Sequence, residues 1–261
     1  MPTSGFSACA VIPVYNHERA IEAVLMGVLA HGVHVILVDD GCSAICQREL
    51  QRLSTSENCR ANVTLLRHDA NRGKGAAVIT GMRAAQQRGF THALQIDADG
   101  QHTLADVGRF VDDARAHPGN VICGYPVFDA SIPAVRYYGR YLTHAMVWLE
   151  TLSFDIRDSM CGFRVYPLRE VTALLAHASV GDRMDFDTEI IVRMHWRGVP
   201  MRWIGTRVSY PADGVSHFRM FFDNARMTSL HIRLACGMLV RLPMLLWRKL
   251  VRQSRTHRAH A

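Results

Sequence analysis

The sequence predicts an α/β fold, a mostly parallel sheet flanked by helices, and three observations predict it. Short apolar runs alternate with segments of helical periodicity through the first half of the 261-residue chain. Clusters of polar residues follow directly after several of these runs. Apolar residues make up 49% and charged residues 20% of the chain, which supplies a sizeable core and excludes a disordered or fibrous protein.

The apolar runs are predicted to be buried strands. They cover residues 8–14, 35–38, 63–66, 93–96 and 121–123. Helices are predicted between them, over residues 20–30, 44–53, 76–87 and 104–116. Strand and helix in strict alternation is typical of a parallel sheet with both faces covered, because each parallel connection must cross over a face.

The pattern is less regular in the second half of the chain. We predict helices and extended pieces in the order 133–152 helical, 158–166 loop then extended, 186–196 helical and 201–210 extended. An open parallel sheet binds its ligand beyond the carboxyl ends of its strands. We therefore expect this half to form the opposite wall of that site, on the acceptor side.

Two acids, Asp97 and Asp99, directly follow a predicted strand. Residues i and i+2 of an extended segment point to the same side, and two like charges there are unfavourable without a cation. A hard divalent ion takes few protein carboxylates and completes its shell with water and phosphate oxygens. The pattern indicates Mg²⁺ or Mn²⁺ held by Asp97, Asp99 and Gln101 against a diphosphate. The alternative is an Asp-rich turn that caps the next helix.

Two further polar clusters are predicted to lie in the same crevice. Asp39 and Asp40 end another strand, where a carboxylate can accept hydrogen bonds from a nucleobase or ribose, or simply form a turn. Residues 71–75 open a helix, whose free backbone N–H groups favour an anion. This segment fits neither a Walker A loop nor a dinucleotide-binding glycine motif.

Taken in order, these motifs resemble glycosyltransferase family 2, and in particular its dolichol-phosphate mannosyltransferase and polyprenyl-phosphate glucosyltransferase branch. The first four are IPVYN at 12–16, VDDG at 38–41, NRGKGAA at 71–77 and QIDADGQH at 95–102. The likeness continues in DSMCGFRVY at 158–166, FDTEIIVR at 186–193 and GVSHF at 214–218.

The resemblance implies a GT-A (Rossmann-like) fold over residues 1–220 and a metal-dependent, inverting glycosyltransferase. It implies transfer of a hexose from a nucleotide-diphosphate sugar to a lipid-linked acceptor, either polyprenyl phosphate or a lipid hydroxyl. The donor-binding residues are expected to be Pro13, Tyr15, Asp39, Asp40, Lys74 and Asp97. The catalytic candidates are Asp99, Asp158, Asp187 and Glu189, and the acceptor-side candidates are Arg164, Ser216, His217 and Arg219.

The chemistry explains the catalytic candidates. Charge develops on the departing diphosphate, and a divalent cation stabilises it. A phosphate acceptor is already a nucleophile, whereas a hydroxyl acceptor needs a carboxylate base, for which Asp185 is a further candidate. The alternative for Asp185 and Asp187 is capping of the helix that follows.

The sequence departs from the branch at two phosphate-binding positions. Gly124-Tyr125-Pro126 stands where members often have an arginine, and His217 stands where they have a lysine. Arg136, Arg140 and Arg219 could substitute. The departures motivate a second hypothesis, in which a non-catalytic protein of the same fold binds a nucleotide sugar or recruits a partner enzyme to the membrane.

The C-terminal segment, residues 221–261, is predicted to be a basic amphipathic helical tail. From residue 216 the chain has nine Lys or Arg and one Asp, which accounts for its net charge of +7. Six arginines recur every seven or eight residues and so form one helical stripe: Arg219, Arg226, Arg233, Arg241, Arg248 and Arg255. We expect this stripe to lie on an anionic membrane surface. The alternative is an ordinary amphipathic helix packed on the domain.

The location of the protein follows from the same features. Pro243 is expected to break the tail, whose longest apolar runs of 7 and 6 residues are too short to span a bilayer. Seven cysteines without a metal motif and an N-terminus without a signal-peptide pattern indicate the cytoplasm. We therefore expect a peripheral protein on the cytoplasmic membrane face, with no nucleic-acid partner because no such motif is present.

Overall fold

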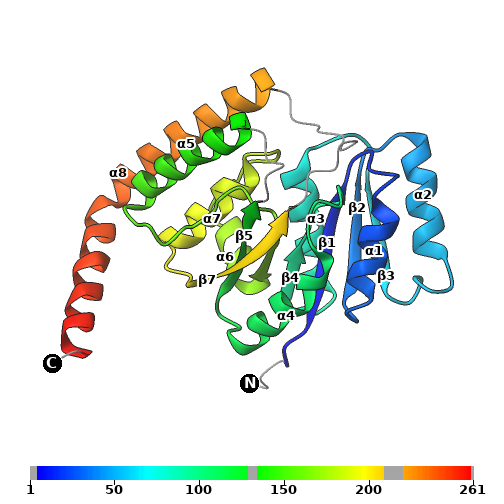
Figure 1. Cartoon of the computed structure of the whole chain (residues 1–261), viewed down its shortest axis with the longest axis horizontal. Coiled ribbons are helices and arrows are strands. Elements are labelled where there is room, and N and C mark those ends of the chain that lie inside the picture. The colour runs from blue at the N-terminus through cyan, green and yellow to red at the C-terminus, as the bar shows by residue number, and fades with distance from the viewer. Residues whose placement is uncertain (1–4, 129–133, 209–219, 260–261) are drawn as a thin grey trace.

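The computed structural model describes residues 5–128, 134–208 and 220–259. Its centre is a seven-stranded sheet with the order β3-β2-β1-β4-β6-β5-β7 (Figure 1). The strands are β1 (Ala8–Val14), β2 (His34–Asp40), β3 (Val63–His68), β4 (His92–Gln95), β5 (Val121–Phe128), β6 (Arg164–Pro167) and β7 (Met201–Val208). The described part of the chain also forms α1 (Ile21–Leu29), α2 (Ala44–Thr55), α3 (Lys74–Gln87), a 3-10 turn at Leu104–Asp106, α4 (Val107–Ala116), α5 (Ala134–Thr151), α6 (Leu168–Leu175), α7 (Phe186–Trp196) and α8 (Met220–Ala259).

The sheet is mostly parallel, which confirms the predicted fold class. β1 pairs in parallel with β2 and β4, β2 with β3, and β5 with β7. β6 is antiparallel to both of its neighbours and joins the two parallel groups. Neither this strand direction nor α6 was indicated by the alternating pattern.

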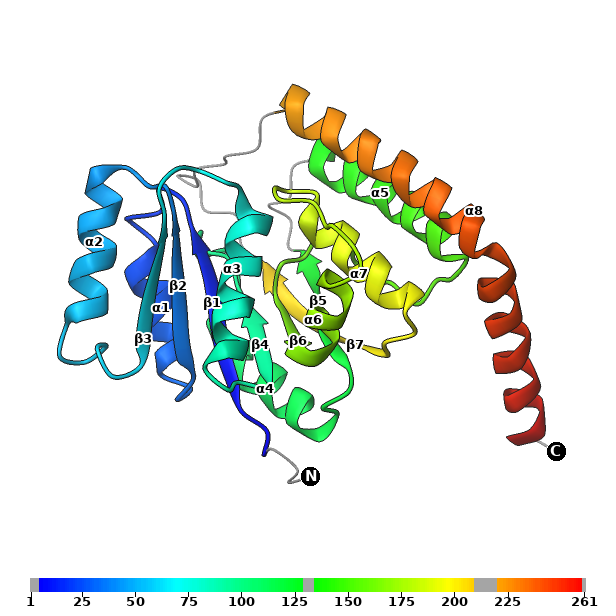
Figure 2. The same cartoon turned by 180° about the vertical axis from the view of Figure 1, so that it is seen from behind.

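Helices cover both faces of the sheet, as Figures 1 and 2 show from opposite sides. α1, α2 and α4 pack on one face through Leu25, Leu50 and Phe110, which are fully buried. α3, α6 and α7 pack on the other face in a second apolar cluster. Gly81 of α3 permits close contact, because an added Cβ there would lie 2.3 Å from Val11 Cγ1 in β1.

Helix α8 runs beside α5 along the outside of the domain (Figures 1 and 2). The helix is continuous through Pro243, so the predicted break is wrong, although its axis changes direction in the second half. A missing N–H and a ring clash bend a helix without ending it when packing holds both arms. The segment Phe222–Val251 is long and apolar enough to cross a membrane by length and composition. The expectation that the tail lies in the interface without spanning it therefore stays a prediction.

Two described arginines of the stripe reach the domain while staying about half exposed, at 46% for Arg226 and 51% for Arg233, so contact of the stripe with a membrane stays a prediction. Arg226 forms an ion pair with Asp182, and Arg233 with Glu189. The opposite side of the helix carries exposed apolar side chains, among them Leu239 and Val240. These two arginines have carboxylate partners because Asp182 lies in the loop before α7 and Glu189 lies in α7, both next to α8.

Candidate active site at the carboxyl edge of the sheet

The predicted crevice lies where β1, β2 and β4 end and α3 begins. Asp40 at the end of β2 accepts hydrogen bonds from the backbone N–H groups of Arg72, at 2.9 Å, and Gly73, at 2.8 Å. It also pairs with His68 Nδ1 at 2.7 Å. Asp40 is buried, and these contacts assign it to anchoring the loop before α3 to the sheet.

Asp39 differs from its neighbour because part of its carboxylate is free. Its Oδ1 accepts a hydrogen bond from Cys42 N at 2.8 Å. Its Oδ2 is buried, has no hydrogen-bond partner among the described residues and lies 3.7 Å from Arg67 Nε. Pro13 is buried within β1 beside it, and the partly exposed Tyr15 follows at the strand end. A buried carboxylate oxygen that faces Arg67 but accepts no hydrogen bond suits a donor group such as a nucleobase or ribose.

Lys74, the first residue of α3, is the centre of the site. Its Nζ lies 2.7 Å from Asp97 Oδ1 and 2.7 Å from Asp187 Oδ2. The other Asp187 oxygen accepts from Gln95 Nε2 at 2.7 Å. Burial alone disfavours an ammonium ion, but the two carboxylates raise the pKa of Lys74 and keep it charged. The sequence assigned Lys74 and Asp187 to separate roles, whereas the structure joins them in one ion-pair network.

The charge of Asp97 acts on Asp99, and their joint binding of a cation stays a prediction. Burial opposes the charge of Asp97, but Lys74 and His102 together more than compensate and hold the pKa of that carboxyl below its usual value. Burial and the charge of Asp97 raise the pKa of Asp99. Asp99 Oδ1 accepts from Gln101 N at 3.0 Å, so the alternative of an Asp turn is also present in this segment.

The chemistry of these acids fits a divalent ion bound largely by its substrate. The described residues contain no group of three or more His, Cys, Asp or Glu side chains arranged to hold a metal. A site that uses two carboxylates together with phosphate oxygens and water does not require such a group. The pKa of Asp99 is raised first by its burial and then by the charge of Asp97, and a cation between the two carboxylates would favour the charged form of both.

Gly162 lies directly against the ion pair of Lys74 and Asp97. An added Cβ at Gly162 would lie 2.8 Å from Lys74 Nζ and 2.9 Å from Asp97 Oδ2. The segment from Asp158 to Gly162 therefore needs a residue without a side chain at its tip in order to lie against the ion pair. The sequence around Gly162 does not indicate this contact, because Lys74 and Asp97 are far away along the chain.

His102 is a site residue that sequence analysis did not single out. Its Nε2 lies 3.9 Å from Asp97 Oδ2, and its ring is 5.3 Å from that of Phe163. Its Nδ1 is buried and makes no hydrogen bond with any described residue. The sequence does offer one indication of this role, because His102 belongs to the same polar cluster as Asp97 and Asp99.

Asp158 is buried and fully engaged. Arg140 donates to both of its oxygens, at 2.5 and 2.7 Å, and His144 Nε2 lies 3.2 Å away. The backbone N–H groups of Met160 and Cys161 donate to it as well. Although burial opposes its charge, these partners hold the pKa of Asp158 below its usual value. Asp158 is therefore a weak base and organises the loop that carries Gly162.

Two acids of the α7 region, Glu189 and Asp185, also have partners. Asp185 Oδ1 accepts a hydrogen bond from Arg183 N at 3.2 Å. Glu189 pairs with Arg193 at 2.6 Å and with Arg233 of α8 at 3.2 Å. Asp185 occupies the N-cap position of α7 but makes no capping hydrogen bond through its side chain, so the capping alternative is wrong for this residue.

Arg164 does not lie where the sequence predicted. It is fully buried in β6, where it donates to the carbonyls of Asp187 and Ser159, both at 2.7 Å. It is buried because β6 is paired on both sides within the sheet, and it ties α7 to the loop after Asp158. Three other acceptor-side candidates, Ser216, His217 and Arg219, lie outside the described residues.

Comparison with known proteins places this geometry in context. The model of glycosyl transferase family 2 matches residues 9–172. A UDP-N-acetylglucosamine–dolichyl-phosphate N-acetylglucosaminyltransferase of Methanococcus voltae is 33% identical over 170 residues, which cover 60% of this chain and 67% of that protein. The polyprenol monophosphomannose synthase of Mycolicibacterium smegmatis is 27% identical over 170 residues, 60% of each chain.

A solved structure shares the fold. It is the glucosyl-3-phosphoglycerate synthase of Mycobacterium tuberculosis in complex with Mn²⁺, UDP-glucose and phosphoglyceric acid, with a TM-score of 0.60 and 15% identity. The alignment covers 90% of this chain and 80% of that one. At this identity the likeness concerns the fold alone.

Proposed function

Because the chain belongs to glycosyl transferase family 2, has a GT-A fold and is a glycosyltransferase, we propose that it transfers a hexose to a lipid-linked phosphate. The donor is a nucleotide-diphosphate sugar, and the transfer inverts the anomeric centre. The names of the two relatives, which contain dolichyl phosphate and polyprenol monophosphomannose, support this substrate class. The reaction takes place on the cytoplasmic face of the membrane.

The donor binds at the carboxyl edge of the sheet. Asp39 Oδ2, which accepts no hydrogen bond within the described residues and lies beside Tyr15 and Pro13, accepts one from the base or ribose. Mg²⁺ or Mn²⁺, held by Asp97 and Asp99 with Gln101 nearby, would stabilise the negative charge that develops on the departing diphosphate. Lys74 fixes Asp97 in its charged state, so the site presents a carboxylate at neutral pH.

The proposal of a phosphate acceptor rests on the ion pairs that the acidic residues make. A hydroxyl acceptor needs a base, yet each acid candidate on the acceptor side is already paired with a cation. Asp158 pairs with Arg140, Asp187 with Lys74, and Glu189 with Arg193. Asp185 Oδ2 lies 4.0 Å from Arg233 Nη2. A phosphate is already ionised and attacks without a base. The site as built therefore suits a phosphate nucleophile better than an alcohol.

A non-catalytic protein of the same fold remains the second candidate. Gly124-Tyr125-Pro126 lacks the arginine that the resemblance leads one to expect, and Arg140 is committed to Asp158. Under this hypothesis the donor binds but is not consumed. The two hypotheses therefore differ in whether the protein consumes the nucleotide-sugar donor.

A donor panel tests the proposal. The melting temperature is measured with UDP- and GDP-sugars in the presence and absence of Mn²⁺, and release of nucleotide is then measured with polyprenyl phosphate. We expect one donor to raise the melting temperature in a Mn²⁺-dependent way and to turn over. Asp99→Asn removes the Mn²⁺ effect, whereas Asp112→Asn, an exposed acid paired with Arg115 on α4, leaves it unchanged. Binding without turnover would favour the second candidate, and no shift with any donor would contradict both.

The C-terminal residues 221–261 are proposed to act as the membrane-interfacial segment. Support comes from the exposed apolar side of α8, where Leu239, Val240 and Trp247 are at least 61% exposed. Flotation of the full chain with vesicles, compared with a variant that has Leu239 and Val240 replaced by Ser, measures this contribution. Equal flotation of both proteins would count against it.

A further inference from the structure

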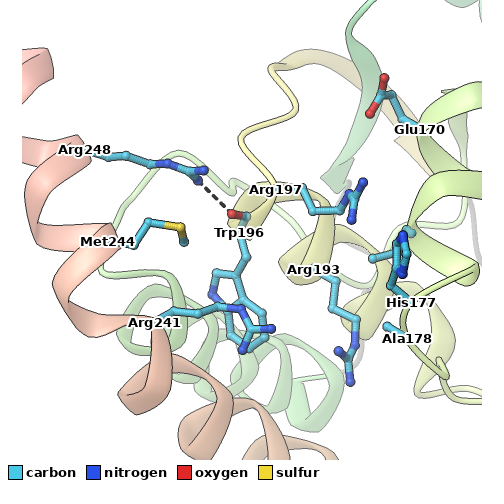
Figure 3. A pocket seen from close by; sticks show the side chains of 10 residues that line it. Glu170, His177, Ala178, Arg193, Trp196, Arg197, Arg241, Met244 and Arg248 are labelled. Atoms are coloured by element: carbon cyan, nitrogen blue, oxygen red, sulfur yellow. Dashed lines mark hydrogen bonds between the residues drawn. The ribbon is translucent and has the colours of Figure 1, made fainter.

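A cavity of about 410 Å³ lies away from the active site, between the ends of α6 and α7 and the second half of α8 (Figure 3). Four arginines line it: Arg193, Arg197, Arg241 and Arg248. The active-site residue Asp187 is at the other end of α7 from Trp196, which is about 14 Å away at the rise of an α-helix. The cavity is therefore a separate site.

The charge in this cavity is not balanced by the protein. Arg193 is paired with Glu189, but none of the ion pairs among the described residues involves Arg197, Arg241 or Arg248. The one acid in the lining, Glu170, is not paired with any of them. A cavity whose lining carries guanidinium groups without a paired carboxylate favours an anion.

The arginines of α8 differ in whether a carboxylate of the domain lies opposite them. Along this stripe, Arg226 and Arg233 meet the carboxylates of Asp182 and Glu189. Arg241 and Arg248 continue the same face by one and two further steps of seven or eight residues, and there the domain offers a cavity instead of an acid. An anionic ligand would complete the pattern.

Two of these arginines are held in place. Arg248 Nη1 donates to the carbonyl of Trp196 at 2.7 Å, as Figure 3 shows. The Arg241 guanidinium lies 4.7 Å from the centre of the Trp196 ring, and its Nη1 donates to Gly237 O at 2.9 Å. Trp196 is itself buried and fixed by a hydrogen bond to Glu150 O. Each guanidinium has five N–H donors, so both keep several for a ligand.

The chemistry of the lining selects the ligand. Planar guanidinium groups bind phosphate oxygens in pairs, which makes arginine the preferred residue for phosphate recognition. Arg241, Met244 and Arg248 share one face of α8, and the opposite face carries exposed apolar side chains, including Leu246 and Leu250. With that apolar face in the acyl region of a bilayer, the cavity lies at the level of the head groups.

We propose that this cavity is a phosphate-binding site, distinct from the active site. The phosphate reaches it either as the head group of an anionic phospholipid or as free phosphate.

Binding measurements on the full-length chain test this proposal. Affinity for inorganic phosphate is measured by calorimetry, and flotation is measured with vesicles of phosphatidylcholine alone and with 20% phosphatidylglycerol. The test protein carries Arg241→Gln and Arg248→Gln. The matched control is Arg226→Gln with Arg233→Gln, which removes the same charge from the same face outside the cavity. Arg197→Gln is a second variant that breaks no described hydrogen bond, and it keeps the test informative if the first variant unfolds.

We expect phosphate affinity to fall at least fivefold in both cavity variants and less than twofold in the control. A parallel loss of the preference for phosphatidylglycerol identifies the lipid as the source. An unchanged preference identifies free phosphate. Equal losses in cavity and control variants, or no phosphate binding by the unmodified chain, overturn the proposal. Donor binding, measured separately, reports on the active site alone.

Discussion

Replacing Lys74 by glutamine tests the ion-pair network at the centre of the site. The chain has only two lysines, and Lys249 on the exposed side of α8 supplies the matched control. In the Lys74→Gln variant the carboxylates of Asp97 and Asp187 lose the ammonium that lies 2.7 Å from each. The variant therefore buries two uncompensated charges.

The magnitude follows from the burial of the network. The Lys74 side chain is 16% exposed and that of Asp187 6%, so solvent screens the pair only weakly. Breaking one partner of a buried pair costs about 3–5 kcal/mol. For a chain of this size each kcal/mol lowers the melting temperature by roughly 2–4 °C. We expect Lys74→Gln to lower it by roughly 6–20 °C, and Lys249→Gln to leave it nearly unchanged.

The pH dependence gives a second, independent readout. In the unmodified chain the pKa of Asp97 is held below its usual value, so its pairing stabilises the fold above about pH 4 and is lost only as the pH falls through the lower folded value. Without Lys74, only His102 opposes the effect of burial on Asp97, so we expect the pKa of that carboxyl to rise and the group to take up a proton as the pH falls. The stability difference between the two proteins should therefore narrow from pH 7 to pH 5.

Thermal unfolding followed by circular dichroism at both pH values measures these effects. A Lys74→Gln variant as stable as Lys249→Gln would refute the account of the network. A stability difference that stays constant between pH 7 and pH 5 would show that the loss comes from packing and not from charge.

Three further substitutions probe neighbouring contacts. Gly162→Ala should lower turnover at least tenfold because its Cβ enters the space of Lys74 and Asp97, whereas Gly119→Ala, which meets no atom within 4 Å, should not change turnover. Asp40→Asn should lower stability by about 1–3 kcal/mol in urea unfolding, since it weakens charge-assisted bonds to the loop before α3; an unchanged midpoint would contradict that anchoring role. Arg140→Gln should raise the pKa of Asp158 and move acid unfolding to higher pH, as measured by fluorescence, and an unmoved transition would show that His144 alone suffices.

The first half of the fold could be predicted because local pattern and final structure agree there. Each strand and helix from β1 to α4 is a separate apolar or periodic segment, and parallel connections leave little choice of topology. The direction of β6 depends instead on its register with β4 and β5, where Gln95 pairs with Arg164. Nothing local in a strand of four residues specifies that register.

The site was predicted in part for the same reason. The clusters at Asp39 and Asp97 follow strand ends, so topology alone brings them together. The pairing of Lys74 with Asp187 joins residues that are 113 positions apart, and only tertiary packing creates it. The orientation of the arginine stripe also depended on packing, because a helical period fixes which residues share a face and not what that face contacts.

The position of β6 has a consequence for synthesis of the protein. β1 to β4 can pair as soon as residue 95 has left the ribosome, but the free edge of β4 is covered only when Arg164–Pro167 arrives. During the intervening interval the nascent chain carries an open strand edge, which is a site for pairing with other chains. We expect ribosome-bound chains that end between β4 and β6 to depend on chaperones more than those that extend past β7.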